Sequence, residues 1–253
     1  MRAFDLLSSW DVPHVSVGIA DRHGLLQVDS ARSTSGDPGR RYRIASDAKL
    51  FVAYAFLVAV EERSIALDEP AGPEGSTVRH LLAHTAGYSF TGAEPIAPVG
   101  HRRIYSNTGI EVAARHLEER TGFPYGEYLH DAVLQPLGMS DTALKGSPAW
   151  GIYSTVGDLA RFVAELCAPT LVAPQTLGEA TTTQFPGLRG ILPGVGRFIP
   201  CDWGLGFEKN FGRPHHWSGT AFSHGAFGHF GGSGTFLVVD PSIACGVICL
   251  TDR

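Results

Sequence analysis

A serine and a lysine stand three residues apart at the start of an apolar segment, in the order Ser46-Asp47-Ala48-Lys49. Side chains three apart on a helix lie on one face, so a helix here places the serine hydroxyl about one turn from the lysine amine. A serine hydroxyl is a weak nucleophile and needs a base, which a lysine with a pKa lowered by burial can supply. The N-terminus of a helix also offers free N–H groups where an oxyanion would form. The spacing predicts Ser46 as a nucleophile and Lys49 as its activator.

The same spacing has a simpler interpretation, in which Ser46 caps a helix and Lys49 extends into solvent. Four apolar residues, 50–53, follow the lysine directly. They place Lys49 at the mouth of an apolar helix, which weakens the simpler interpretation.

A second polar motif, Tyr105-Ser106-Asn107, follows the basic stretch 101–103 and precedes a predicted helix. A tyrosine held next to a lysine can be drawn toward its phenolate form and pass a proton, so Tyr105 is a candidate catalytic residue. The Asn107 side chain can hold a substrate amide or the lysine itself. Taken alone, this motif is better explained by a loop tyrosine and a capping asparagine.

A glycine-rich motif at 228–234, with the sequence GHFGGSG, lies just before a predicted strand. Glycines let the backbone approach a ligand, so the N–H of Gly232 can pair with that of Ser46 as an oxyanion hole. A phosphate-binding loop is disfavoured, because such loops lead from a strand into a helix and this one leads into a strand.

Two other hydrolytic sites are disfavoured by the sequence. His80 and His84 have a spacing that can bind zinc on a helix, but the adjacent glutamate of the usual peptidase motif is missing. His84 is better explained as a buried, hydrogen-bonded residue in the turn before Gly87. No Gly-x-Ser-x-Gly motif occurs, which argues against an α/β-hydrolase. We therefore predict no metal and no cofactor.

The elements that must position these residues follow from hydrophobic periodicity. The first motif opens a predicted helix over 46–64 that is apolar nearly all round, as expected for a helix buried between a sheet and other helices. Further helices are predicted at 77–84, 108–120, 125–133 and 155–167. Alternating segments at 15–20 and 25–28, and again at 235–239 and 246–250, predict one hairpin near each end of the chain.

Strand pairs at both ends with a mainly helical middle predict an α+β fold, in which both termini build one antiparallel sheet flanked by helices. We expect a single domain over 1–253, with the sheet formed from about 12–45 and 203–253 and a helical lobe over about 65–200. Residues 202–207 are predicted as a strand, and most of 170–202 as loop with short helical pieces.

The composition indicates which classes of partner the protein is expected to bind. A chain of 253 residues with 43% hydrophobic and 18% charged residues has the balance of a folded protein. A formal net charge of -5 gives no electrostatic reason to bind nucleic acid or an anionic membrane, so a small molecule is the expected partner. Residues 1–12 contain neither a secretory signal nor a membrane span, which predicts a cytoplasmic protein.

The order of the three motifs resembles the group of class C β-lactamases, penicillin-binding proteins and related esterases. His-x-Gly at 229–231 takes the place of the Lys-Thr-Gly of that group. Flanking stretches are similar as well: LLAHTAG at 81–87, PLGM at 136–139 and the closing hairpin around 240–241. The resemblance covers the chain from about residue 12 and implies a β-lactamase/transpeptidase-like fold.

The resemblance implies a role for each matching residue. Ser46 would be acylated by an ester or amide, Lys49 would be its base and Tyr105 a proton shuttle. Asn107 would contact a substrate amide and the lysine. His229 would assist the proton network or bind the substrate, next to Gly231 and Gly232. Water would then release the acid in a second step.

Three departures from the group's pattern shape the hypotheses. Asp47 stands where an uncharged residue is usual and could pair with Lys49 or repel acidic substrates. His229 in place of lysine is more similar to esterases and D-amino-acid peptidases than to strong β-lactamases. The chain also ends at Arg253, directly after the last predicted strand, where members of the group continue into a helix. The leading hypothesis is an esterase-like serine hydrolase; the alternatives are a weakly active or non-catalytic binding module, and a D-amino-acid peptidase or β-lactamase.

Overall fold

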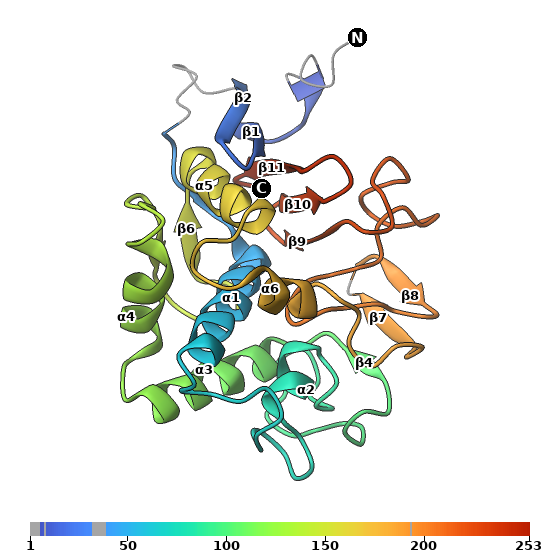
Figure 1. Ribbon diagram of the computed structural model, residues 1–253. Coiled ribbons are helices and arrows are strands. Elements are labelled where there is room, and N and C mark those ends of the chain that lie inside the picture. The colour runs from blue at the N-terminus through green and yellow to red at the C-terminus, as the bar shows by residue number, and fades with distance from the viewer. Residues whose placement is uncertain (1–5, 8, 32–38, 193) are drawn as a thin grey trace.

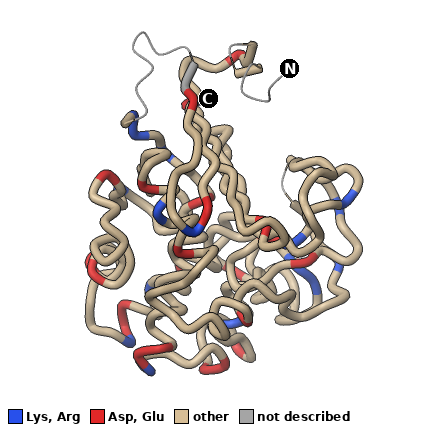
Figure 2. Tube along the Cα trace, turned by 45° about the horizontal axis from the view of Figure 1, so that its top comes forward, with Lys and Arg blue, Asp and Glu red and all other residues tan. Residues whose placement is uncertain are grey.

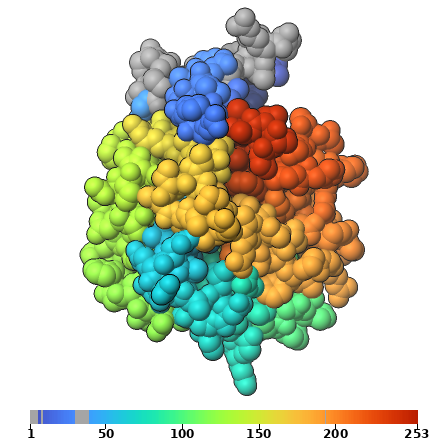
Figure 3. Space-filling view, in the orientation of Figure 1, coloured from blue at the N-terminus to red at the C-terminus, as the bar shows by residue number. Residues whose placement is uncertain are grey.

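The two ends of the chain form one antiparallel sheet of five strands. The computed structural model describes residues 6–7, 9–31, 39–192 and 194–253. The strand order is β2-β1-β11-β10-β9, and β1 pairs with β11 from Val15 opposite Thr251 to Asp21 opposite Cys245. In Figure 3 the first strands (blue) and the last strands (red) lie side by side at the top of the molecule. The α+β fold with a sheet built from both termini is confirmed. The strands are β1 (Val15–Asp21), β2 (Gly24–Ala31), β9 (Phe227–Gly231), β10 (Thr235–Asp240) and β11 (Cys245–Thr251).

Part of the glycine-rich motif, which precedes the strand predicted at 235–239, is itself a strand. β9 pairs with β10 along its length, from Gly231 opposite Thr235 to Phe227 opposite Val239, and forms one edge of the sheet. Its glycines serve close backbone approach: a Cβ on Gly228 would lie 2.1 Å from the Leu237 carbonyl oxygen. The glycines here mark an edge strand that other backbone approaches closely.

Helix α1 (Ala48–Glu61) runs through the centre of the molecule (Figure 1). Every residue from Ala48 to Ala59 is buried, which confirms the prediction made from its all-round apolar sequence. Its neighbours include strand β9 and a set of shorter or more amphipathic helices. These are α3 (Asn107–Thr121), α4 (Tyr125–Leu129), the π-helical turn η3 (His130–Leu134) and α6 (Pro174–Ala180).

Helix α5 (Val156–Cys167) lies between the five-stranded sheet and α1. Its Phe162 ring stacks on Phe51 of α1 with ring centroids 4.4 Å apart. Thr155 caps the helix by accepting a hydrogen bond from the N–H of Asp158 at 3.1 Å. Although its residues fall within the range expected for the helical lobe, α5 packs on the sheet.

Two small three-stranded sheets complete the described part of the chain. One contains β3 (Tyr42–Arg43), β6 (Ile152–Ser154) and β5 (Ala143–Leu144), and leads into the Ser46 turn. The other contains β4 (Arg103–Ile104), β7 (Gly190–Leu192) and β8 (Gly196–Phe198), and leads into Tyr105. Strands β7 and β8 fall in the stretch predicted as loop, because strands of three residues are too short to show a period. The short helix α2 (Val78–Leu82) precedes His84.

The strand predicted at 202–207 is wrong: only an isolated bridge, between Trp203 and Glu208, forms there. The close backbone approach expected of this segment is present, but against helices. A Cβ on Gly204 would lie 2.0 Å from the Ala180 carbonyl oxygen, and one on Gly206 would lie 2.5 Å from Ala53 Cβ of α1. The glycines therefore fit a loop between helices.

Charged residues of both signs are interspersed along the chain (Figure 2). None of the helices in the described residues is both long and apolar enough to cross a membrane.

Candidate active site

Ser46 lies in a tight 3-10 turn, η2 (Ala45–Asp47), directly before α1. Ala45 has φ of 49°, a left-handed conformation that side chains other than glycine adopt only where surrounding structure imposes it. Ser46 is partly buried and sits within the turn, where no side-chain capping bond forms. The interpretation of Ser46 as a helix cap is therefore wrong, and its hydroxyl is left for another partner.

The Lys49 amine is that partner. Its Nζ donates to Ser46 Oγ at 3.1 Å, as the three-residue spacing predicted. The side chain is fully buried, and this burial lowers the pKa of Lys49 to about 7, against the raising effects of the Asp47 and Glu111 carboxyls. A large fraction of the amine is therefore neutral at pH 7 and able to accept the serine proton.

A backbone carbonyl from a distant part of the sequence also holds the Lys49 amine in place. Lys49 Nζ donates to the Ala149 carbonyl oxygen at 2.8 Å. The loop carrying Ala149 is fixed by Ser147, whose Oγ accepts from the Ala149 N–H at 3.1 Å and donates to Glu111 of α3. Nothing in the sequence indicated Ala149, because a carbonyl oxygen belongs to every residue type.

Tyr105 is packed in a cluster of rings beside the lysine. Lys49 Nζ lies 4.8 Å from the centre of the Tyr105 ring, over its face. The rings of His84, Trp203 and His229 lie 4.7, 5.7 and 5.5 Å away. Burial raises the pKa of Tyr105. A hydrogen bond with Ser46 lowers this pKa, but by a smaller amount. The expected phenolate is therefore disfavoured, and Tyr105 rests as a neutral phenol.

His229 is not placed to touch a substrate. It is fully buried, and its Nδ1–H donates to the Phe230 carbonyl oxygen at 2.7 Å. Nε2 is left as an acceptor with no partner among the described residues. Burial and the charge of Lys49 lower the pKa of His229 to about 3, so the ring is neutral. The ring packs beside Tyr105, with ring centroids 5.5 Å apart, and has no exposed surface in this arrangement.

Asn107 begins helix α3 close to this cluster. Its N–H donates to the Phe90 carbonyl oxygen at 2.8 Å, and the preceding Ser106 caps the helix by accepting from the Gly109 N–H at 3.0 Å. The Asn107 Oδ1 atom is buried and has no partner among the described residues. The expected bond to Lys49 is not formed, because the lysine is held by Ser46 and Ala149, and the amide oxygen stays free.

The turn between β9 and β10 is tied to the backbone just before Ser46. Ser233 Oγ donates to the Arg43 carbonyl at 2.7 Å, and Thr235 Oγ1 donates to the Ile44 carbonyl at 2.8 Å. A Cβ on Gly231 would lie 2.4 Å from the Ile44 carbonyl oxygen, so only glycine allows this approach. Gly231 thus shapes the site through its backbone. Gly232 follows it in an exposed position with open space around it, as an oxyanion-hole donor requires.

Asp47 lies behind the nucleophile, away from solvent. The side chain is 1% exposed, and neither carboxyl oxygen accepts a hydrogen bond from a described residue. Burial raises the pKa of Asp47 well above its usual range, against smaller lowering effects of Thr235 and Lys49. A buried carboxyl cannot repel a substrate at the opening, and it forms no ion-pair bond to Lys49.

We expect Asp47→Asn to stabilise the protein increasingly as pH rises. The Asp47 carboxyl keeps its proton in the folded protein, because its pKa there is raised. The unfolded chain releases that proton above about pH 4. The free energy of unfolding therefore falls as pH increases beyond that point. An asparagine removes this loss, so its advantage in unfolding free energy is expected to grow by at least about 1 kcal/mol between pH 4 and pH 8. Urea unfolding at both pH values measures it, with the exposed Asp131→Asn as control. An advantage that does not change with pH would refute the raised pKa.

The two histidines with zinc-like spacing, His80 and His84, contact different residues. His84 is buried and its Nδ1 accepts from the Ser106 N–H at 3.3 Å, which confirms the hydrogen-bonded interpretation. His80 contacts Thr77 Oγ1 at 2.9 Å and stacks on Phe185. Across the described residues, no group of three or more His, Cys, Asp and Glu side chains is placed to hold a metal ion.

Comparison with known proteins agrees with the fold. The sequence model of the Beta-lactamase family matches residues 9–253. A solved structure described as a beta-lactamase, from Mycobacterium bovis, is 45% identical with a TM-score of 0.94, and the match covers 100% of this chain and 92% of that one. A D-stereospecific amidohydrolase from a Streptomyces species shares the fold at 21% identity and a TM-score of 0.76, with 98% and 93% of the two chains covered.

A curated relative matches over a shorter region. An uncharacterised protein of Alkalihalophilus pseudofirmus is 28% identical over 131 residues, which are 47% of this chain and 38% of that protein's length. The family match, in contrast, extends over nearly the whole sequence. The chain belongs to the beta-lactamase family, whose members are generally serine hydrolases.

Proposed function

We propose that this protein is an esterase-like serine hydrolase that forms an acyl-enzyme on Ser46 from an ester or amide of a small molecule. One observation carries the proposal: a buried lysine amine, whose pKa is lowered to about 7, donates to the Ser46 hydroxyl at 3.1 Å. In its neutral form the same amine can accept the hydroxyl proton, which activates the nucleophile.

The proposed reaction assigns a residue to each step. Ser46 Oγ attacks the carbonyl carbon while its proton passes to Lys49 Nζ, and the N–H groups of Ser46 and Gly232 hold the resulting oxyanion. The bond to the leaving group then breaks, and the proton on Lys49 reaches that group through the neutral Tyr105 phenol. Water attacks the acyl-enzyme and gives its proton to Lys49. The bond to Ser46 Oγ then breaks, Lys49 returns the proton to Ser46 Oγ, and the acid is released.

The state of His229 favours an ester over a penicillin as the substrate. A cation at the corresponding position of the Lys-Thr-Gly motif would attract the carboxylate that penicillins carry, whereas His229 is buried and neutral. The free amide oxygen of Asn107 can accept from a substrate N–H, which keeps a D-amino-acid amide as the second candidate. The shared fold of the Streptomyces amidohydrolase is consistent with that candidate.

We expect a panel of chromogenic substrates to separate these activities. A nitrophenyl ester of a short fatty acid is expected to give a kcat/KM at least about tenfold above that of a D-alanine nitroanilide, because the ester has the better leaving group. A penicillin is expected to be turned over more slowly still. If the penicillin is hydrolysed fastest, the esterase assignment fails. If no substrate is turned over and none acylates the protein, the non-catalytic binding module is the remaining interpretation.

A further inference from the structure

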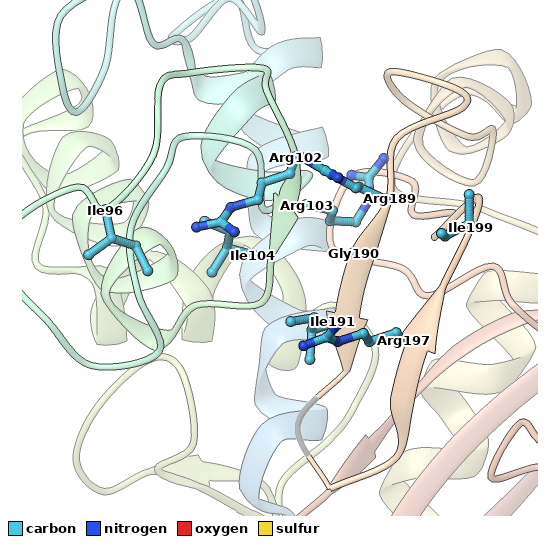
Figure 4. A pocket seen from close by; sticks show the side chains of 9 residues that line it. All are labelled: Ile96, Arg102, Arg103, Ile104, Arg189, Gly190, Ile191, Arg197 and Ile199. Carbon is cyan, nitrogen blue, oxygen red and sulfur yellow. The ribbon is translucent and has the colours of Figure 1, made fainter.

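A cavity of about 390 Å³ lies on the outer face of the small sheet β4-β7-β8 (Figure 4). Its walls are made almost entirely of isoleucine and arginine. The lining residues are Ile96, Arg102, Arg103, Ile104, Arg189, Gly190, Ile191, Arg197 and Ile199.

Strand register explains why these side chains gather. Ile104 pairs with Ile191, and Ile191 with Arg197, so these three lie in one row on one face of the sheet. Alternation along each strand puts Arg102, Arg189 and Ile199 on the same face. Figure 4 shows Arg102 reaching toward Ile104 and Ile96, and Arg197 lying across Ile191.

Three of the arginines are free to bind an anion. Arg102, Arg189 and Arg197 form no ion pair with any described residue, and no acidic side chain lines the cavity. The Arg102 Nε atom is buried without a partner. Arg103 is different, because its guanidinium is satisfied by the carbonyls of residues 83, 184, 185 and 201. In a chain with a net charge of -5, three unpaired arginines around one cavity make a local positive site.

The isoleucines give the cavity an apolar side. Ile96, Ile191 and Ile199 are 57%, 50% and 81% exposed, although isoleucine is among the residues most often buried. Clustered exposed apolar side chains usually mark a binding surface. An occupant must therefore offer both an anionic group and an apolar chain.

We propose that this cavity binds a small amphipathic carboxylate, with its chain against the isoleucines and its carboxylate on the arginines. A planar carboxylate matches the fork of donors on a guanidinium. The site is separate from the acylation site: Ile104 faces the cavity, while the next residue, Tyr105, packs toward Lys49 on the other side of the strand. The proposal does not depend on the hydrolase function.

Titration calorimetry with sodium octanoate on the full chain tests this site. Octanoate is expected to bind more tightly than acetate, which lacks the chain, than octanol, which lacks the charge, and than inorganic phosphate. Equal affinity for phosphate and octanoate would overturn the amphipathic assignment. The absence of octanoate binding would overturn the site as a whole.

Substitutions in the cavity test whether octanoate binds there. Arg197→Gln is expected to weaken octanoate binding roughly tenfold, the usual effect of losing a charged hydrogen bond. Ile191→Asn should weaken it as well, whereas the exposed Arg115→Gln on α3 should not. Octanoate should bind Ser46→Ala as it binds the unaltered protein. Binding that is unchanged in both Arg197→Gln and Arg102→Gln would place the ligand elsewhere and refute the proposal.

Discussion

Replacing Ser46 by alanine is expected to lower kcat for a nitrophenyl ester by about 10³-fold or more, because the acyl-enzyme can no longer form. The hydroxyl that is removed is partly exposed, and its side-chain partners are Lys49 and Tyr105. Alanine should therefore fold as the serine form does, and circular dichroism and thermal unfolding check this. The measurement is nitrophenol release at saturating ester.

A matched serine makes the comparison specific. Ser242 lies exposed in the turn between β10 and β11, and Ser242→Ala should retain full turnover. Turnover by Ser46→Ala within about tenfold of the unaltered protein would show that the ester is cleaved without this serine, because loss of a nucleophile costs far more.

Lys49→Met is expected to lower kcat/KM by about 10²- to 10⁴-fold, the usual range for removing a general base. Methionine is apolar and of similar length, so it suits the fully buried position better than a shorter or charged residue would. Lys145→Met, at an exposed lysine, serves as the control. A Lys49→Met protein that folds and remains fully active would remove the lysine from the mechanism.

The pH profile gives a second test of the same residue. Lys49 accepts a proton only when neutral, and its pKa is lowered to about 7. The kcat/KM of the unaltered protein should therefore rise with pH through about 7 and level off above it. Below that value it should fall about tenfold for each pH unit. Lys49→Met should lack this limb, and a profile of the unaltered protein that is flat between pH 5 and pH 9 would contradict the assignment.

The parts of the site governed by local geometry could be predicted from the sequence. Three-residue spacing on a helix is enough to bring Lys49 to Ser46, and an all-round apolar sequence is enough to bury α1. These two features need no knowledge of distant contacts. The contact of Tyr105 with Lys49 was anticipated only through the resemblance to a known family.

The electrostatic states of the site depend on burial, which the sequence does not display. Asp47 appeared able to face a substrate, but its side chain is buried in the turn that begins at Ala45. Tyr105 was expected near its phenolate form, but its ring is enclosed by His84, Trp203 and His229, which keeps it neutral. Such effects arise from residues that are far apart in the sequence: Trp203 and His229 lie 98 and 124 positions after Tyr105.

Short strands and backbone contacts were the other features that the sequence did not predict. No strand was predicted at β9, whose glycines allow an edge strand to approach the nucleophile turn. Strands β7 and β8, which carry three of the nine residues that line the proposed carboxylate site, span three residues each and show no periodicity. The Ala149 carbonyl that orients Lys49 has no side-chain signature at all.

Covalent labelling tests the activated serine most directly. The protein is incubated with a fluorophosphonate at pH 8, its intact mass is measured, and the modified peptide is sequenced by tandem mass spectrometry. We predict a single adduct, located on Ser46, that is absent in Ser46→Ala and forms far more slowly in Lys49→Met. No adduct on the folded protein, or an adduct on another residue that persists in Ser46→Ala, would contradict the assignment of Ser46 as the nucleophile.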